Sequence, residues 1–320
     1  MKNISVEPVV PSIRDYDYEV VCGSVDAAEL PDYFIIPDGK VGVIKDQVVN
    51  GIEILACAAE AASCFAQYFH KEDTGEDIEF SEAWFYATGR EDWQTGKGLN
   101  VPTLFEKWRK IGALPKTYLN KLMEMPAMKE VVDAAPGLKE IAKNHKLGGS
   151  VTLNYANSEK KENAIRSALV KYRYGLFAVS NSYFGGPHAI IIVGYNFKDP
   201  KNKKYIIQNS YGEDYGDKGI AEVPISAINS AYLLTYNPIK LPFTDLDDNW
   251  AKEDIKNVYL SGLMKGVSDT EFDPKGNVIR EQLAAVLNRQ NKSIVYMIET
   301  AVNIVRKEME LMENRITKKR

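Results

Sequence analysis

Residues 44–57 read IKDQVVNGIEILAC, and this stretch decides how the rest of the chain is interpreted. An apolar run ends in the polar pair Asp46 and Gln47, and the turn dipeptide Asn50-Gly51 follows. From residue 51 to residue 70 the apolar side chains recur at helical spacing, which predicts a helix that begins at this turn. A helix N-terminus carries partial positive charge and stabilises a negative group placed there. The stretch therefore predicts a polar loop that leads into the start of an apolar helix.

Length, charge and hydropathy narrow the class of protein. The chain has 320 residues, enough for two domains or for one large domain with appendages. Its formal net charge is −4 and its basic residues are scattered, so no nucleic-acid partner is expected. No stretch approaches the roughly 18 apolar residues of a transmembrane span, and none is expected. We also expect no cofactor and no metal.

The N-terminal residues bear on where the protein acts. Residues 1–15 lack the basic region and apolar run of a secretory signal. We therefore expect a protein that is cytoplasmic as encoded, or that belongs to a phage particle or a cell-surface assembly. The three cysteines are Cys22, Cys57 and Cys64. The last two lie roughly 10 Å apart along the predicted helix, too far for a disulfide, so reduced and mostly buried thiols are expected.

Four segments follow one another along the chain. Residues 1–29 are polar and predict an N-terminal arm. Residues 30–240 begin with helical patterns and continue, after residue 150, with short β-rich runs. This order predicts an α+β domain of two lobes with a site between them. Residues 241–289 form a separate unit. Residues 290–320 contain no Pro or Gly and predict an amphipathic helix, which either packs on its own chain or forms homo-oligomers.

Two further stretches complete a pattern with the opening one. Residues 185–195 read GGPHAIIIVGY, and residues 208–219 read QNSYGEDYGDKG. Together and in this order, the three stretches resemble the papain family of cysteine peptidases, over residues 30 to about 236. The third follows the family's Asn-Ser-Trp-Gly-x-x-Trp-Gly-x-x-Gly without a gap, with tyrosine at both tryptophan positions. The resemblance implies a helical lobe, a β-barrel-like lobe and a cleft between them that takes a peptide or protein.

The resemblance also implies a role for each motif residue. In the family a cysteine thiolate at a helix start attacks, a histidine moves the proton, and an asparagine orients the imidazole. A glutamine amide stabilises the oxyanion. His188 matches the base, Asn209 its orienting partner and Gln47 the oxyanion donor. Aligned on residues 47–53, the family pattern Gln-Gly-x-x-Gly-Ser-Cys places Glu53 at the position of the nucleophile.

A glutamate at that position changes the expected chemistry. A carboxylate attacks an amide poorly, because the product would be a high-energy anhydride. Our hypothesis is that a Glu53–His188 ion pair replaces the thiolate–imidazolium pair and preserves the cleft without acyl transfer. The alternative nucleophile is Cys57, which needs four inserted residues after Gln47.

Three functions follow from these alternatives. The favoured one is a catalytically inactive module that binds a peptide or protein partner within a cell-envelope or phage-particle assembly. The second is an active papain-like cysteine endopeptidase at a bacterial cell surface. The third is a purely structural component of a surface layer or virion.

Residues 242–289 resemble one S-layer homology repeat. Such repeats usually act in threes to hold secondary cell-wall polysaccharide, so the resemblance implies cell-wall glycan as a partner of this segment. The matching pieces are FTD at 243–245, WA at 250–251, GLMKG at 262–266, FDP at 272–274 and IREQLA at 279–284.

Overall fold

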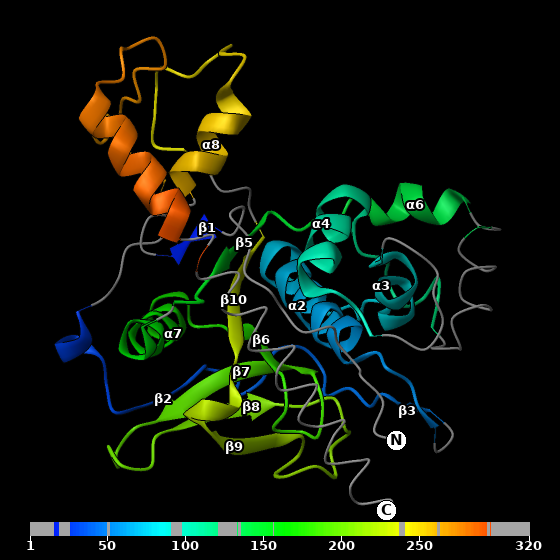
Figure 1. Ribbon diagram of the computed structural model, residues 1–320. Coiled ribbons are helices and arrows are strands. Elements are labelled where there is room, and N and C mark those ends of the chain that lie inside the picture. The colour runs from blue at the N-terminus through cyan, green and yellow to red at the C-terminus, as the bar shows by residue number, and fades with distance from the viewer. Residues whose placement is uncertain are drawn as a thin grey trace, which may run out of the picture. The chain divides into compact units, whose positions relative to one another are not determined.

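The chain divides into two compact units in a computed structural model (Figure 1). Unit 1 contains Met1–Val9 and Ser24–Ile239, and unit 2 contains Val10–Gly23 and Lys240–Arg320. The predicted helix of residues 290–320 lies almost entirely outside the described residues. The structure describes residues 16–18, 26–49, 52–90, 98–120, 133, 136–155, 157–236, 241–260, 263–292 and 295.

The helical part of unit 1 is built around α2 (Cys57–Thr74), which is buried along most of its length. It ends at Gly75, whose φ of 77° suits glycine and whose N–H donates to the Lys71 carbonyl. The Ser81 side chain caps α3 (Glu82–Thr88) by accepting from the backbone N–H of Trp84. The other helical elements of unit 1 are η1 (Ala27–Glu29), α4 (Val101–Ile111), α6 (Pro136–Ala142), α7 (Ser158–Tyr172) and η2 (Ile225–Ala227).

An antiparallel sheet forms the other part of unit 1. Its strands lie in the order β5-β10-β6-β7-β8-β9, and β2 pairs with β7 beside this path. The central strand β7 packs against α2, so the sheet and the helical part meet along these two elements. The strands are β2 (Tyr33–Ile35), β5 (Gly149–Thr152), β6 (Leu176–Ser180), β7 (His188–Asn196), β8 (Lys204–Gln208), β9 (Ile220–Pro224) and β10 (Ser230–Thr235). The α+β prediction is confirmed.

A second, two-stranded sheet precedes α2. Strand β3 (Val48–Val49) pairs antiparallel with β4 (Ile52–Glu53), with Val48 opposite Glu53. The prediction of a helix that begins at residue 51 is therefore wrong, because α2 begins at Cys57. β-Branched residues on both sides of an Asn-Gly dipeptide are the strongest short-range signal for a hairpin, and this signal outweighs the helical spacing of the next few residues.

Unit 2 has a small core of its own. Phe243, Leu246, Ile255 and Phe272 are buried together, and the carboxylate of Asp245 accepts hydrogen bonds from the backbone N–H groups of two loop residues. Those bonds tie the start of the unit to a loop after α8. Among its described residues, unit 2 contains β1 (Tyr16–Asp17), α8 (Lys252–Leu260) and a helix over residues 280–292. No helix among the described residues of the chain is long and apolar enough to cross a membrane.

Candidate active site

Cys57 is the first residue of α2 and lies against the start of β7. Its Sγ accepts a hydrogen bond of 3.2 Å from the backbone N–H of Ala189, which directly follows His188. The thiol thus stands at a helix N-terminus, where the dipole lowers the free energy of a thiolate. Strands β3 and β4 lie between Gln47 and the helix. The first helical residue, Cys57, is therefore ten positions after the glutamine.

Glu53 does not stand at the helix start. It belongs to β4 and precedes the first residue of α2 by four positions. The prediction that Glu53 lies at the helix N-terminus is wrong, because the β3–β4 strand pair separates Gln47 from the helix. The proposed ion pair with His188 thereby loses the helix dipole on which it depended.

His188 and Asn209 form the hydrogen bond that the motifs predicted. Nε2 of His188 lies 2.7 Å from Oδ1 of Asn209, and both side chains are buried. Because a carboxamide oxygen only accepts, the imidazole proton belongs on Nε2, and Nδ1 is the nitrogen that can take a proton. Burial lowers the pKa of His188 to about 4, against the opposing effect of the Asn209 bond. The imidazole is therefore neutral near pH 7.

Two aromatic rings enclose the imidazole. The Tyr211 ring stacks on His188 with centroids 4.9 Å apart and planes 3° from parallel, and the Phe184 ring lies 5.0 Å away. Tyr211 is the first of the two tyrosines that replace tryptophan in the motif. A backbone bridge between Tyr211 and Asp46 joins this loop to the opening stretch. The rings remove the His188–Asn209 bond from water and limit rotation of the imidazole.

Gln47 is buried and tied to the residue that follows Asn209. Its backbone N–H donates to the Ser210 carbonyl at 3.0 Å, and its Oε1 accepts from the Ser210 hydroxyl at 3.3 Å. The structure therefore brings Gln47, Cys57, His188 and Asn209 into one region from separate parts of the chain. In the described part of the chain, no group of three or more His, Cys, Asp or Glu side chains is placed to hold a metal ion.

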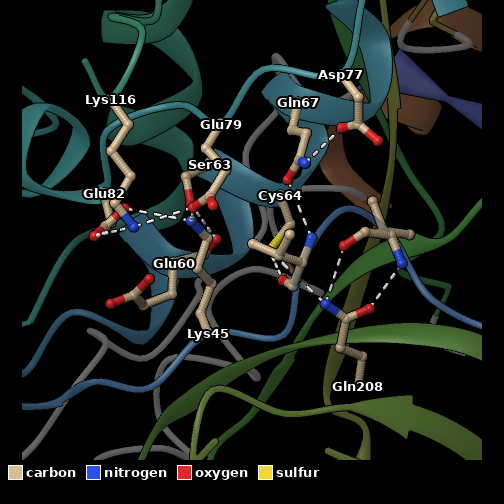
Figure 2. Close-up of polar contacts among 12 residues, drawn as sticks. Lys45, Glu60, Ser63, Cys64, Gln67, Asp77, Glu79, Glu82, Lys116 and Gln208 are labelled. Carbon is tan, nitrogen blue, oxygen red and sulfur yellow. Dashed lines mark hydrogen bonds and ion pairs between the residues drawn. The ribbon is translucent and has the colours of Figure 1, made fainter. Parts of the chain in front are cut away.

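A cluster of charged side chains, which no sequence pattern indicated, lies beside this region. The lysine–glutamate cluster consists of Lys45, Glu60, Glu79, Glu82 and Lys116 (Figure 2). Nζ of Lys45 lies 2.9 Å from Glu79 and 3.5 Å from Glu82, while Lys116 approaches the same two acids at 3.1 and 3.2 Å. Its members are spread over residues 45–116, so no local sequence pattern indicates that they form a cluster.

The second thiol of α2 differs from the first. Cys64 lies within the helix, donates to the Val43 carbonyl at 3.3 Å, and is buried. Burial raises the pKa of the Cys64 thiol to about 12, partly offset by the nearby Lys45. Cys64 therefore stays protonated at neutral pH and is a poor nucleophile. Both cysteines of α2 are thiols, as expected from their spacing.

Comparisons with known proteins agree with this fold. Residues 131–232 match the model of the papain family cysteine protease, and residues 242–284 match that of the S-layer homology domain. Xylellain, a cysteine protease from Xylella fastidiosa, is 18% identical with a TM-score of 0.55, over 73% of this chain and 98% of that one. No curated protein matches the sequence. The fold is thus the papain-like fold of cysteine peptidases, and an S-layer homology segment follows it.

Two precursor structures match over a similar part of the chain. A recombinant stem bromelain precursor is 18% identical with a TM-score of 0.49, over 73% of this chain and 76% of that one. A digestive procathepsin L 3 from the larval midgut of Tenebrio molitor is 15% identical with a TM-score of 0.48, over 69% and 76%.

Proposed function

We propose that unit 1 is a thiol-dependent peptidase with Cys57 as nucleophile, His188 as general base, Asn209 as its orienting partner and Gln47 as oxyanion donor. The observation that carries this proposal is the 3.2 Å hydrogen bond from Ala189 to Cys57 Sγ, because it puts the thiol of a helix N-terminus beside the residue after His188. The inactive module that the sequence alone favoured thereby becomes the alternative.

Each step uses the chemistry of a named side chain. Neutral His188 accepts the Cys57 proton at Nδ1, and the sulfur attacks the peptide carbonyl carbon. The carboxamide of Gln47 and a backbone N–H stabilise the oxyanion of the tetrahedral intermediate. His188 then donates its proton to the leaving amine, and water hydrolyses the thioester with His188 again as base. Asn209 keeps the proton on Nε2 throughout, so that Nδ1 faces the reaction.

One observation fits both a peptidase and the alternative of a non-catalytic binding module. Cys57 is 0% exposed, Gln47 0% and His188 1%, so the site is closed to solvent. A closed site is compatible with a resting peptidase that opens for its substrate. It is equally compatible with a site that catalyses no reaction. Reaction of the native chain with a thiol reagent separates the two.

The test is covalent labelling of the full chain with iodoacetamide and with a peptidyl epoxide. Cys22 lies outside the described residues, so a Cys22→Ser variant is labelled in parallel. We expect a single adduct on Cys57 after peptide mapping, and slower labelling in His188→Asn, because the base that activates the thiol is absent. Cys64 serves as the internal control and stays unlabelled until the protein is denatured. A native chain whose Cys57 labels no faster than Cys64 would overturn the peptidase proposal.

We also propose that unit 2 tethers the peptidase to cell-wall glycan. The match of residues 242–284 to the S-layer homology domain supports this role, and the Asp245 bonds give the segment a defined loop structure. We expect the full chain to sediment with purified Gram-positive cell walls, and to stay in solution after the secondary polysaccharide is extracted. Equal retention on both preparations would argue against a glycan tether. The virion or surface-layer alternative, and oligomerisation through residues 290–320, stay predictions.

A further inference from the structure

Two buried polar atoms beside the proposed site have no hydrogen-bond partner among the described residues. They are Oε2 of Glu60 and Nδ2 of Asn209. Both side chains are 2% exposed, so bulk water does not reach them. Buried polar atoms in native proteins nearly always have a partner, and an ordered water counts as one. The partner of each atom is therefore not found among the described residues.

Both residues line the same small cavity. The space available to the centre of a water molecule is about 10 Å³, close to the minimum that one water needs. Cys57 and Ser210 also line the cavity, which lies between α2 and the segment that carries Asn209. A buried water is stable where it finds two to four polar partners, and this cavity offers a donor at Asn209 and an acceptor at Glu60.

We propose that a buried water accepts a hydrogen bond from Nδ2 of Asn209 and donates one to Oε2 of Glu60, which makes Glu60 a positioning residue for His188. Oδ1 of Asn209 already accepts from His188 and from the backbone N–H of Ser210, at 2.7 and 2.8 Å. Anchoring Nδ2 from the opposite side prevents rotation of the carboxamide, which would otherwise turn a donor toward the His188 proton. This inference rests on the proposed peptidase function of the same site.

Burial favours the neutral form of Glu60, and a neighbouring carboxylate adds to this effect. Burial and, next, the carboxylate of Glu82 raise the pKa of Glu60 well above its usual value, against the opposing charges of Lys45 and Lys116. The two lysines already balance the carboxylates of Glu79 and Glu82. A proton on Glu60 therefore leaves the lysine–glutamate cluster without net charge. Asp46, Cys57 and Cys64 are further titratable groups near it among the described residues.

The neutral state suggests a matched pair of variants. Glu60→Gln keeps the shape and the ability to accept from water, whereas Glu60→Leu removes the acceptor. For the full-length protein we expect kcat for a peptide substrate to fall about tenfold in Glu60→Leu, with little change in KM. This is the effect of losing one buried hydrogen bond. Glu60→Gln should stay within about twofold of the parent. Glu72→Leu, an exposed position on the same helix, is the control for helix effects.

A second measurement does not depend on catalysis. The Nε2 proton of His188 should give a slowly exchanging NMR resonance in the parent and in Glu60→Gln, and a broadened one in Glu60→Leu. Crystal structures of the parent and both variants should show the water in the first two only. If Cys57 proves to be inert, these two readouts still test the water link. An empty cavity in the parent, or a His188 resonance unchanged in Glu60→Leu, would overturn the inference.

Discussion

Replacing Cys57 with alanine is expected to lower kcat/KM for peptide hydrolysis at least about 10⁴-fold, because no other group at the helix N-terminus can form the acyl intermediate. The thiol lies at the first residue of α2 and accepts from Ala189 next to His188. The measurement is hydrolysis of a fluorogenic peptide by the full chain under reducing conditions. Unfolding midpoints of parent and variant show whether the fold is intact.

Glu53 supplies the matched control for this prediction. Glu53→Gln should leave kcat/KM within about threefold of the parent, because the residue belongs to β4 and not to the helix start. The double variant Cys57→Ala/Glu53→Cys should remain inactive, since its thiol lies in the strand. Full activity of Cys57→Ala, or recovery of activity in the double variant, would contradict the role of Cys57. It would support the alignment that puts residue 53 at the nucleophile's position.

Lys45→Met is expected to destabilise the protein by about 3 kcal/mol, because removal of one partner leaves the largely buried carboxylate of Glu82 with Lys116 alone in the cluster to balance it. Lys45 is 6% exposed, and it is the more buried of the two lysines that neutralise Glu79 and Glu82. Glu82 is only 10% exposed, so its carboxylate cannot recover much solvation. Unfolding in urea gives the change in the free energy of unfolding, provided that the two units are resolved by separate probes.

Two variants accompany Lys45→Met. Lys71→Met breaks an ion pair with Asp77 in which both side chains are 51% exposed, and it should change the unfolding midpoint far less. Lys45→Met/Glu82→Gln removes the largely buried carboxylate that loses its Lys45 partner in the single variant, and it should recover part of the loss. If Lys45→Met unfolds at the same urea concentration as the parent, the cluster contributes nothing to stability.

The motif residues of the site could be assigned from short contiguous patterns. His188 precedes an apolar run that becomes β7, and Asn209 opens the gap-free stretch of residues 208–219. Their hydrogen bond then follows from the fold, since both residues lie at the ends of neighbouring strands. The start of α2 could not be assigned in this way. The spacing from Gln47 to Gly51 matched the family pattern, and that agreement concealed the β3–β4 strand pair.

Composition and residue order were sufficient for the α+β class and for naming Gln47, His188 and Asn209 as candidate site residues. These properties depend on local periodicity and on motifs that can be read in a few consecutive residues. The identity of the thiol at the helix N-terminus depended on a strand pair between residues 48 and 53 and on a contact between Cys57 and Ala189, 132 positions apart. The link from Glu60 to Asn209 likewise requires two distant segments to enclose one cavity. Such features appear only when the chain is folded, because pairing and burial join residues whose separation in the sequence carries no signal.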